Sequence, residues 1–157
     1  MKNIKSVLLV CTGNSCRSIM ADGLLKKYLK ELGKSDIEVI SAGVHAIDGM
    51  APTKETIEVM KKEGIDVSGF RSRSLTEDHI KKADLILVMA GHHMDDIITR
   101  VPHAASKVHI LKQFGLKHDQ KACEDIDIAD PIGRDRGFYE EVLLTIKEEM
   151  SRVAKIL

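Results

Sequence analysis

Apolar stretches alternate with helix-period stretches along the whole chain. Residues 5–10 form a short, nearly continuous apolar run, which is typical of a strand buried on both faces of a sheet. From Met20 the pattern changes, because apolar side chains recur every three to four residues as far as Leu32, and Gly33 then supplies a helix stop. The chain is therefore expected to begin with a strand, a short loop and a helix.

The same alternation continues beyond this first unit. Further strands are predicted at 37–40, 84–89 and 108–111, and further helices at 52–62, 92–99 and 138–153. Pro52 in the first turn and Gly64 after the last turn mark the ends of the second helix. Strands that alternate with helices imply right-handed crossovers and a parallel sheet.

The expected fold is therefore an α/β single-domain three-layer sandwich, with a four-stranded parallel sheet flanked by about five helices. No linker, low-complexity tract or internal repeat interrupts the pattern. We accordingly expect one domain over residues 1–157.

Composition and charge exclude several classes of protein. The 24 Lys and Arg residues balance 24 Asp and Glu residues, which argues against a nucleic-acid coat or a polybasic membrane module. Three Phe, two Tyr and no Trp leave few platforms on which single-stranded nucleic acid could stack. No N-terminal segment has the pattern of a signal peptide, and three cysteines do not describe a disulfide framework. We expect a cytoplasmic protein that binds neither nucleic acid nor membrane.

The candidate chemistry lies between the first strand and the first helix, where residues 10–18 read Val-Cys-Thr-Gly-Asn-Ser-Cys-Arg-Ser. Open parallel sheets bind ligands at the carboxyl ends of their strands. A small, polar, glycine-containing loop can turn its N–H groups inward, and the N-terminus of the next helix adds partial positive charge. Cys11 and Arg17 have the spacing Cys-x5-Arg-Ser, and such donors favour the thiolate, which is the nucleophilic form of cysteine. Phosphate or another oxyanion is expected in this loop, with Arg17 able to contact two of its oxygens.

This loop resembles the hallmark of the low-molecular-weight protein-tyrosine phosphatases, a family that includes related bacterial protein-arginine phosphatases. The resemblance extends to Ser41-Ala-Gly43 after the second strand, to Arg73 and to Asp130-Pro131. It implies a phosphatase that hydrolyses phosphotyrosine in proteins through a cysteinyl-phosphate intermediate. The implied partner is a phosphorylated protein or peptide, and the protein is expected to be a monomer or weak dimer. The proposed chemistry requires no metal or organic cofactor.

The resemblance also assigns roles to individual residues. The catalytic residues would be the nucleophile Cys11, the oxyanion-binding Arg17, and Asp130, which would protonate the leaving oxygen and then activate water. The phosphate loop would comprise Thr12, Gly13, Asn14, Ser15, Cys16 and Ser18, with Ser41 and Arg73 in support.

Several of these residues have an ordinary structural alternative. Ser18 either donates to the Cys11 thiolate or only caps the helix. Asn14 and Ser41 either pin the loop in its shape or are common turn and loop residues. Cys16 either forms a reversible disulfide with the nucleophile, as the family often does, or is a buried inert residue.

Three positions depart from the pattern of the tyrosine-directed members. Ile19 replaces a usual Pro, Phe70 replaces a His beneath the loop, and Ile132 stands where aromatic residues often flank the cleft. Ser15 is small and polar where those members carry a bulky aliphatic residue, and the arginine phosphatases have Thr there. A protein-arginine phosphatase with the same site is therefore the main alternative.

Other classes receive less support. Arsenate reductases of this fold use two further cysteines after the third strand, whereas residues 89–94 here contain none and Cys123 lies some thirty residues later. A metal site would have to use His92 with Asp96, which is the single i,i+4 pair in that segment. A non-catalytic phosphate-binding module would use the same loop without turnover.

Overall fold

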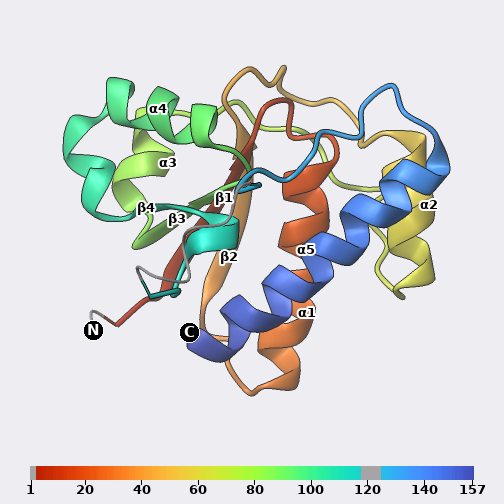
Figure 1. The fold of residues 1–157 in the computed structure, drawn as a ribbon, viewed down its shortest axis with the longest axis horizontal. Coiled ribbons are helices and arrows are strands. Elements are labelled where there is room, and N and C mark those ends of the chain that lie inside the picture. The colour runs from red at the N-terminus through yellow and green to blue at the C-terminus, as the bar shows by residue number, and fades with distance from the viewer. Residues whose placement is uncertain (1–2, 118–124) are drawn as a thin grey trace.

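Four parallel strands form the centre of the molecule. A computed structural model describes residues 3–117 and 125–157. Its strands are β1 (Ser6–Cys11), β2 (Glu38–Gly43), β3 (Leu85–Val88) and β4 (Val108–Ile110). They form one sheet in the order β2-β1-β3-β4 (Figure 1). All pairs are parallel, with Cys11 opposite Gly43 at the carboxyl end of β1.

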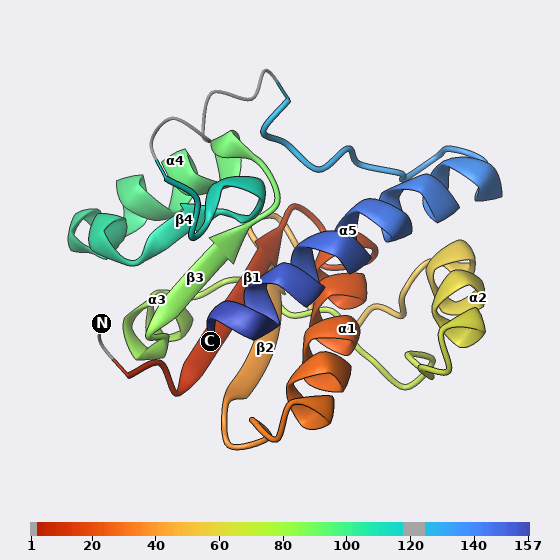
Figure 2. The same cartoon turned by 60° about the horizontal axis from the view of Figure 1, so that its bottom comes forward.

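Helices cover both faces of this sheet. They are α1 (Arg17–Glu31), α2 (Lys54–Lys62), α3 (Glu77–Lys82), α4 (Gly91–Arg100) and α5 (Arg136–Ile156), with short 3-10 turns η1 (Pro102–Ser106) and η2 (Leu111–Gln113). Figure 2 shows α1 and α5 side by side across one face, with α3 and α4 on the other side of the sheet. The three-layer arrangement confirms the predicted fold class.

Two apolar cores follow from the alternation of side chains along β1. Val7 and Leu9 point to the side covered by α1, α2 and α5, whereas Leu8 and Val10 point to the side covered by α3 and α4. All four side chains are buried, which is the environment that the continuous apolar run predicted.

Several predicted boundaries differ from the observed ones. Ser41-Ala-Gly43 was expected after the second strand, but these residues lie inside β2, because they pair with the last residues of β1. The first helix begins at Arg17 rather than Met20, since its first turn is too polar to show an apolar period. Pro52 precedes α2 instead of occupying its first turn, and Thr53 caps that helix.

Helix α3 is the element that the apolar pattern did not locate. It has six residues and a single buried side chain, Ile80, so it presents no repeat to detect. Its start is nevertheless marked by a capping box, in which Thr76 and His79 satisfy each other's backbone N–H groups.

The order of the strands decides where the loops meet. From β1 the chain crosses to β2 on one side, and β3 and β4 follow on the other side, so the sheet reverses its winding between β1 and β3. The loops that leave β1 and β3 therefore diverge at this point, where doubly wound sheets bind ligands. Within the described residues, no helix is long and apolar enough to cross a membrane.

Candidate active site

A small cavity opens at the carboxyl end of β1. Its volume is about 160 Å³, and it is lined by Cys11, Thr12, Gly13, Ser15, Cys16, Arg17, Asp130 and Ile132. The first six run from the last residue of β1 to the first residue of α1, and the last two come from the segment before α5. The structure thus brings together the loop and the distant Asp-Pro pair that the sequence singled out.

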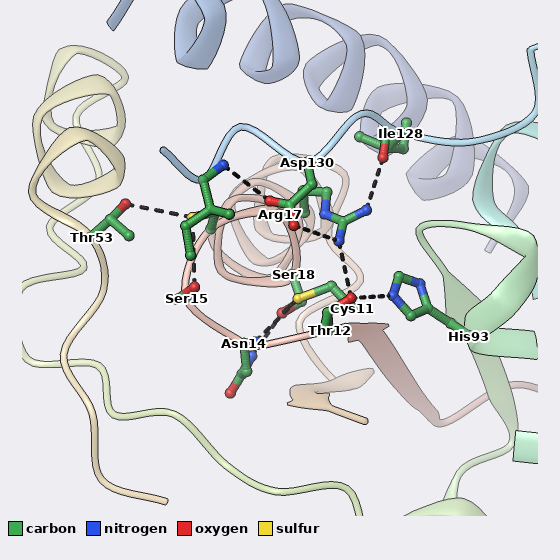
Figure 3. A network of polar contacts seen from close by, with 12 residues as sticks. Cys11, Thr12, Asn14, Ser15, Arg17, Ser18, Thr53, His93, Ile128 and Asp130 are labelled. Carbon is green, nitrogen blue, oxygen red and sulfur yellow. Dashed lines mark hydrogen bonds and ion pairs between the residues drawn. The ribbon is translucent and has the colours of Figure 1, made fainter. Parts of the chain in front are cut away.

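The sulfur of Cys11 lies at the inner end of this loop, and the residue is 2% exposed. The hydroxyl oxygen of Ser18 lies 2.9 Å from this sulfur, and the backbone nitrogen of Asn14 lies 3.3 Å from it (Figure 3). Ser18 Oγ also accepts a hydrogen bond of 2.7 Å from Asn14 Nδ2. Because an amide NH₂ can only donate, the proton of the Ser18 hydroxyl remains available to a Cys11 thiolate, which can only accept.

Ser18 is therefore not the helix cap that the alternative interpretation required. The residue at the cap position of α1 is Cys16, and no side chain caps this end of the helix. The leading amides of a helix have no intrahelical partner, so the first turn of α1 faces the cavity with donors to spare.

Asn14 connects the loop to the neighbouring strand. It is fully buried and has φ of 51°, in the left-handed region that side-chain-bearing residues rarely adopt. Its Nδ2 donates to Ser41 Oγ at 3.1 Å as well as to Ser18, and its Oδ1 accepts from the backbone N–H of Arg73 at 2.9 Å. These three side-chain contacts, together with the backbone contact to the Cys11 sulfur, hold the loop in one shape.

Ser41 and Arg73 thus contribute in different ways. Ser41 uses its hydroxyl, whereas Arg73 uses its backbone, since its carbonyl also accepts from the N–H of Gly43 at 2.9 Å. The Ser41 hydroxyl further contacts the buried carboxylate of Asp22. Burial raises the pKa of Asp22, while an ion pair of 2.7 Å with Lys26 and the Ser41 hydroxyl act in the opposite direction. No sequence signal selects Asp22, because acidic residues near a helix start are common.

Arg17 is held from two sides. The residue is 4% exposed, and its Nη1 donates to the carbonyl of Ile128 at 2.9 Å. Its Nη2 donates to Thr12 Oγ1 at 3.3 Å and lies 3.5 Å from Asp130 Oδ2. The other oxygen of Asp130 accepts from the N–H of Ile132 at 3.1 Å. The guanidinium is therefore fixed in the cavity wall before any ligand binds.

Three hydroxyl groups lie around the sulfur of Cys16. Its sulfur lies 3.5 Å from Tyr139 Oη, 3.6 Å from Thr53 Oγ1 and 3.6 Å from Ser15 Oγ. Tyr139 is buried, and this burial raises the pKa of its hydroxyl. Cys11 and Cys16 are both free thiols in this structure.

His93 is a site residue that the sequence did not assign to the loop. It lies in the first turn of α4, is fully buried, and its Nε2 is 2.8 Å from Thr12 Oγ1. Burial and the charge of Arg17 lower the pKa of His93 to about 3, so the imidazole is neutral at physiological pH. Its place at a helix start just after a central strand was the signal that could have revealed it.

The metal hypothesis is not supported by the geometry of α4. His93 is engaged with Thr12, His92 is exposed, and Asp96 pairs with Arg100 at 2.6 Å. In the part of the chain that the structure describes, no three or more His, Cys, Asp or Glu residues are grouped to hold a metal.

Ser15 and Ile132 line the cavity, whereas Phe70 does not. Ser15 forms part of the cavity wall, and its carbonyl accepts from the N–H of Thr53 at 3.2 Å. Ile132 is 56% exposed at the cavity mouth, while Phe70 packs against the core on the α1 side. Cys123 lies outside the described residues.

Comparisons with known proteins find relatives that match nearly the whole chain. The sequence matches the family model described as "Low molecular weight phosphotyrosine protein phosphatase" over residues 6–157. It is 38% identical over 144 residues to a probable low molecular weight protein-tyrosine-phosphatase, EpsP, of Ralstonia nicotianae, which covers 92% of this chain and 90% of that protein. It is 38% identical over 151 residues to a protein-arginine-phosphatase of Geobacillus stearothermophilus, which covers 96% and 95%. The crystal structure of a low molecular weight protein tyrosine phosphatase from T. tengcongensis superposes with a TM-score of 0.86 at 39% identity, covering 97% of this chain and 99% of that one.

Proposed function

The chain belongs to the low molecular weight phosphotyrosine protein phosphatase family, and from this premise we propose that it hydrolyses phosphotyrosine in proteins through a cysteinyl-phosphate on Cys11. One observation carries the proposal above the others. The Cys11 sulfur lies in an oxyanion-sized cavity, with the Ser18 hydroxyl 2.9 Å from it and the buried Arg17 guanidinium in the same wall.

In the first step the Cys11 thiolate attacks phosphorus, and the bond from phosphorus to the phenolic oxygen breaks. Arg17 and the free amides at the start of α1 bind the oxygens on which negative charge is concentrated. Asp130, at the cavity mouth, donates its proton to the departing oxygen. A tyrosine phenol has a pKa of about 10, so protonation makes it a much better leaving group.

In the second step water attacks the phosphorus of the cysteinyl-phosphate, and Asp130 accepts a proton from that water. The phosphorus–sulfur bond breaks, and inorganic phosphate and the thiolate are the products. The Ser18 hydroxyl, 2.9 Å from the sulfur, stabilises the negative charge that returns to Cys11.

Two substitutions test these roles. Cys11→Ser is expected to lower turnover of a phosphotyrosine peptide by roughly 10⁴-fold or more while phosphate binding persists. Asp130→Asn is expected to lower kcat by roughly 10²-fold or more for poor leaving groups and much less for good ones. Unchanged turnover in Cys11→Ser, or equal losses for both leaving groups in Asp130→Asn, would contradict the mechanism.

A second candidate substrate is phosphoarginine, and Ser15 is the observation that favours it. No aromatic residue is among those that line the described cavity, and Ser15 presents a small hydroxyl there. This leaves room beside the loop for a guanidinium group or for water. A protein-arginine-phosphatase is also among the relatives that cover nearly the whole chain.

A direct comparison of phosphotyrosine and phosphoarginine peptides separates the two substrates. Wild type and Ser15→Ile should be assayed in parallel, with Ser15→Thr as the matched control that keeps the hydroxyl. If Ser15 admits phosphoarginine, the ratio of kcat/KM values shifts toward phosphotyrosine in Ser15→Ile and stays near the wild-type ratio in Ser15→Thr. An unchanged ratio in Ser15→Ile would remove the role of this residue in selectivity.

We further propose that the protein acts in the cytoplasm on phosphorylated proteins, as a monomer or weak dimer. The proposed nucleophile Cys11 must stay reduced, with Cys16 five residues away, and the cytoplasm maintains free thiols.

A further inference from the structure

We propose that His93 is a positioning residue that directs the proton of the Thr12 hydroxyl toward the oxyanion bound in the loop. This proposal rests on the function proposed above and adds a donor to the phosphate site. It is carried by two contacts that converge on the hydroxyl oxygen of Thr12 and by one buried nitrogen that has no hydrogen-bond partner among the described residues.

His93 lies beside the loop that follows β1. Helix α4 begins immediately after β3, which is the neighbour of β1 in the sheet, so its first turn lies beside the loop (Figure 3). His93 is fully buried, and its Nε2 lies 2.8 Å from Thr12 Oγ1. The His93 ring is fixed in place, because it is fully buried and cannot exchange this contact freely with water.

The hydroxyl oxygen of Thr12 contacts both Arg17 and His93. Arg17 Nη2 lies 3.3 Å from it, and a guanidinium only donates, so one lone pair of the oxygen is occupied. The remaining question is whether the hydroxyl proton goes to His93 or whether His93 donates to the oxygen. A neutral imidazole permits either arrangement, because one ring nitrogen carries the proton and the other accepts.

The other ring nitrogen of His93, Nδ1, decides between the two arrangements. Among the described residues, His93 Nδ1 is buried and has no hydrogen-bond partner. If Nε2 accepted the Thr12 proton, Nδ1 would carry a buried N–H with no acceptor, which is the rarer and more costly kind of orphan. The geometry therefore favours the tautomer in which Nε2 carries the proton and donates it to Thr12.

The consequence is a hydroxyl with a fixed direction. With both lone pairs of Thr12 Oγ1 accepting, from Arg17 and from His93, its own proton occupies the remaining tetrahedral position. Thr12 lines the cavity, so this proton is available to an oxyanion there. His93 acts only through Thr12, and it also helps to hold the oxygen to which Arg17 is tied.

A double-mutant cycle on inorganic phosphate tests this coupling. Thr12→Val and His93→Leu are each expected to weaken the Kd for phosphate, measured by calorimetry, by roughly tenfold, the size typical of one hydrogen bond to a charged group. The double variant should bind no more weakly than Thr12→Val alone, because His93 has no other route to the ligand. Additive losses, or an unchanged Kd in His93→Leu, would overturn the proposal.

Matched variants keep the test independent of folding. His93→Gln retains a donor near the position of Nε2 and should bind phosphate more tightly than His93→Leu, whereas His92→Leu removes the exposed neighbouring ring and should bind as wild type does. The tautomer can be read in the wild-type protein from the ¹⁵N chemical shifts of its histidines. A proton on Nδ1 of His93 would refute the inference even if every variant were unstable.

The result is distinguishable from a failure of the proposed function. If wild type does not bind phosphate, the oxyanion site itself is wrong. If wild type binds phosphate and Cys11→Ser abolishes turnover, but the His93 and Thr12 variants show no coupling, only the role of His93 is wrong.

Discussion

At the scale of single residues, the site is organised by groups that can donate but not accept. The amide of Asn14 and the guanidinium of Arg17 each occupy a hydroxyl oxygen, at Ser18 and Thr12 respectively. Each hydroxyl keeps its own proton for another partner, which we propose is the Cys11 thiolate in one case and the ligand in the other. The chemistry of the loop thus depends on the donors that hold these hydroxyl groups as well as on the groups that touch substrate.

Asn14 should therefore be essential for turnover even though it does not react. Asn14→Ala is expected to lower kcat by roughly tenfold or more, because Ser18 and Ser41 both lose their donor. It should also lower the free energy of unfolding by about 2 kcal/mol or more, since φ of 51° is unfavourable for Ala.

Asn14→Gly is the matched control for that prediction. Glycine adopts the left-handed backbone without strain, so this variant should recover part of the stability and none of the activity. Steady-state kinetics and urea unfolding measure the two quantities. Recovery of kcat in Asn14→Gly would mean that the backbone shape alone is sufficient and that the amide is not needed.

At the scale of elements, the end of β2 sets the shape of the loop after β1. Gly43 pairs with Cys11 and packs against the backbone of Thr12 and Asn14, which follow Cys11 in the loop. A Cβ at Gly43 would lie 2.5 Å from the carbonyl oxygen of Thr12 and 2.8 Å from the backbone nitrogen of Asn14. Both neighbours are backbone atoms, so the loop would have to move to admit even a methyl group.

Gly43→Ala is therefore expected to damage the site and the fold together. We expect a loss of roughly 1–3 kcal/mol in the free energy of unfolding, as for an overpacked core, and a fall in kcat/KM of tenfold or more, as an order-of-magnitude estimate. Gly69→Ala provides the control, because a Cβ there would meet nothing within 4 Å. Chemical denaturation and a phosphatase assay on both variants check this, and wild-type activity in Gly43→Ala would show that the contact does not shape the loop.

At the scale of the whole molecule, the site combines three separate parts of the chain. The loop after β1 supplies the sulfur and the amides, the first turn of α4 supplies His93, and the segment before α5 supplies Asp130 and the carbonyl of Ile128. Because the native state buries the His93 imidazole in its neutral form, the free energy of unfolding should depend on pH.

The sign of this effect follows from the two pKa values. His93 has a pKa of about 3 in the native state against its ordinary value of 6.5, so between these values only the unfolded chain binds the proton. Stability should consequently fall as the pH is lowered below 6.5, by at most about 1.4 kcal/mol per pH unit from this residue, or roughly 2 kcal/mol by about pH 5.

Urea unfolding of wild type, His93→Gln and His92→Gln from about pH 7.5 to about pH 5 measures this slope. The His93→Gln variant should lose stability less steeply on acidification than wild type. The difference between the two slopes should correspond to the uptake of close to one proton on unfolding. His92→Gln should stay much closer to the wild-type curve than His93→Gln does, because His92 lowers the pKa of His93 less than burial and Arg17 do. Parallel slopes for wild type and His93→Gln would show that the imidazole is not buried neutral in solution.

The sequence by itself determined the class of the fold and the centre of the site. The alternation of apolar runs with helical periods is local and is driven by burial, so it predicted a parallel α/β sandwich that the structure confirms. Cys11 and Arg17 are six residues apart in one loop, and their proximity follows from the chain alone. Short elements without an apolar repeat, such as α3, were beyond this signal.

Only the tertiary structure decided which distant groups complete the loop. Ser41, His93 and Asp130 meet it because the winding of the sheet reverses between β1 and β3 and because α5 returns across the face covered by α1. A sequence shows which side chains can donate or accept, but the partner of each hydrogen bond is fixed by distances of about 3 Å between segments far apart in the chain. For that reason Cys11 could be selected as the proposed nucleophile from the chain alone, whereas the hydrogen-bond partners around it could not.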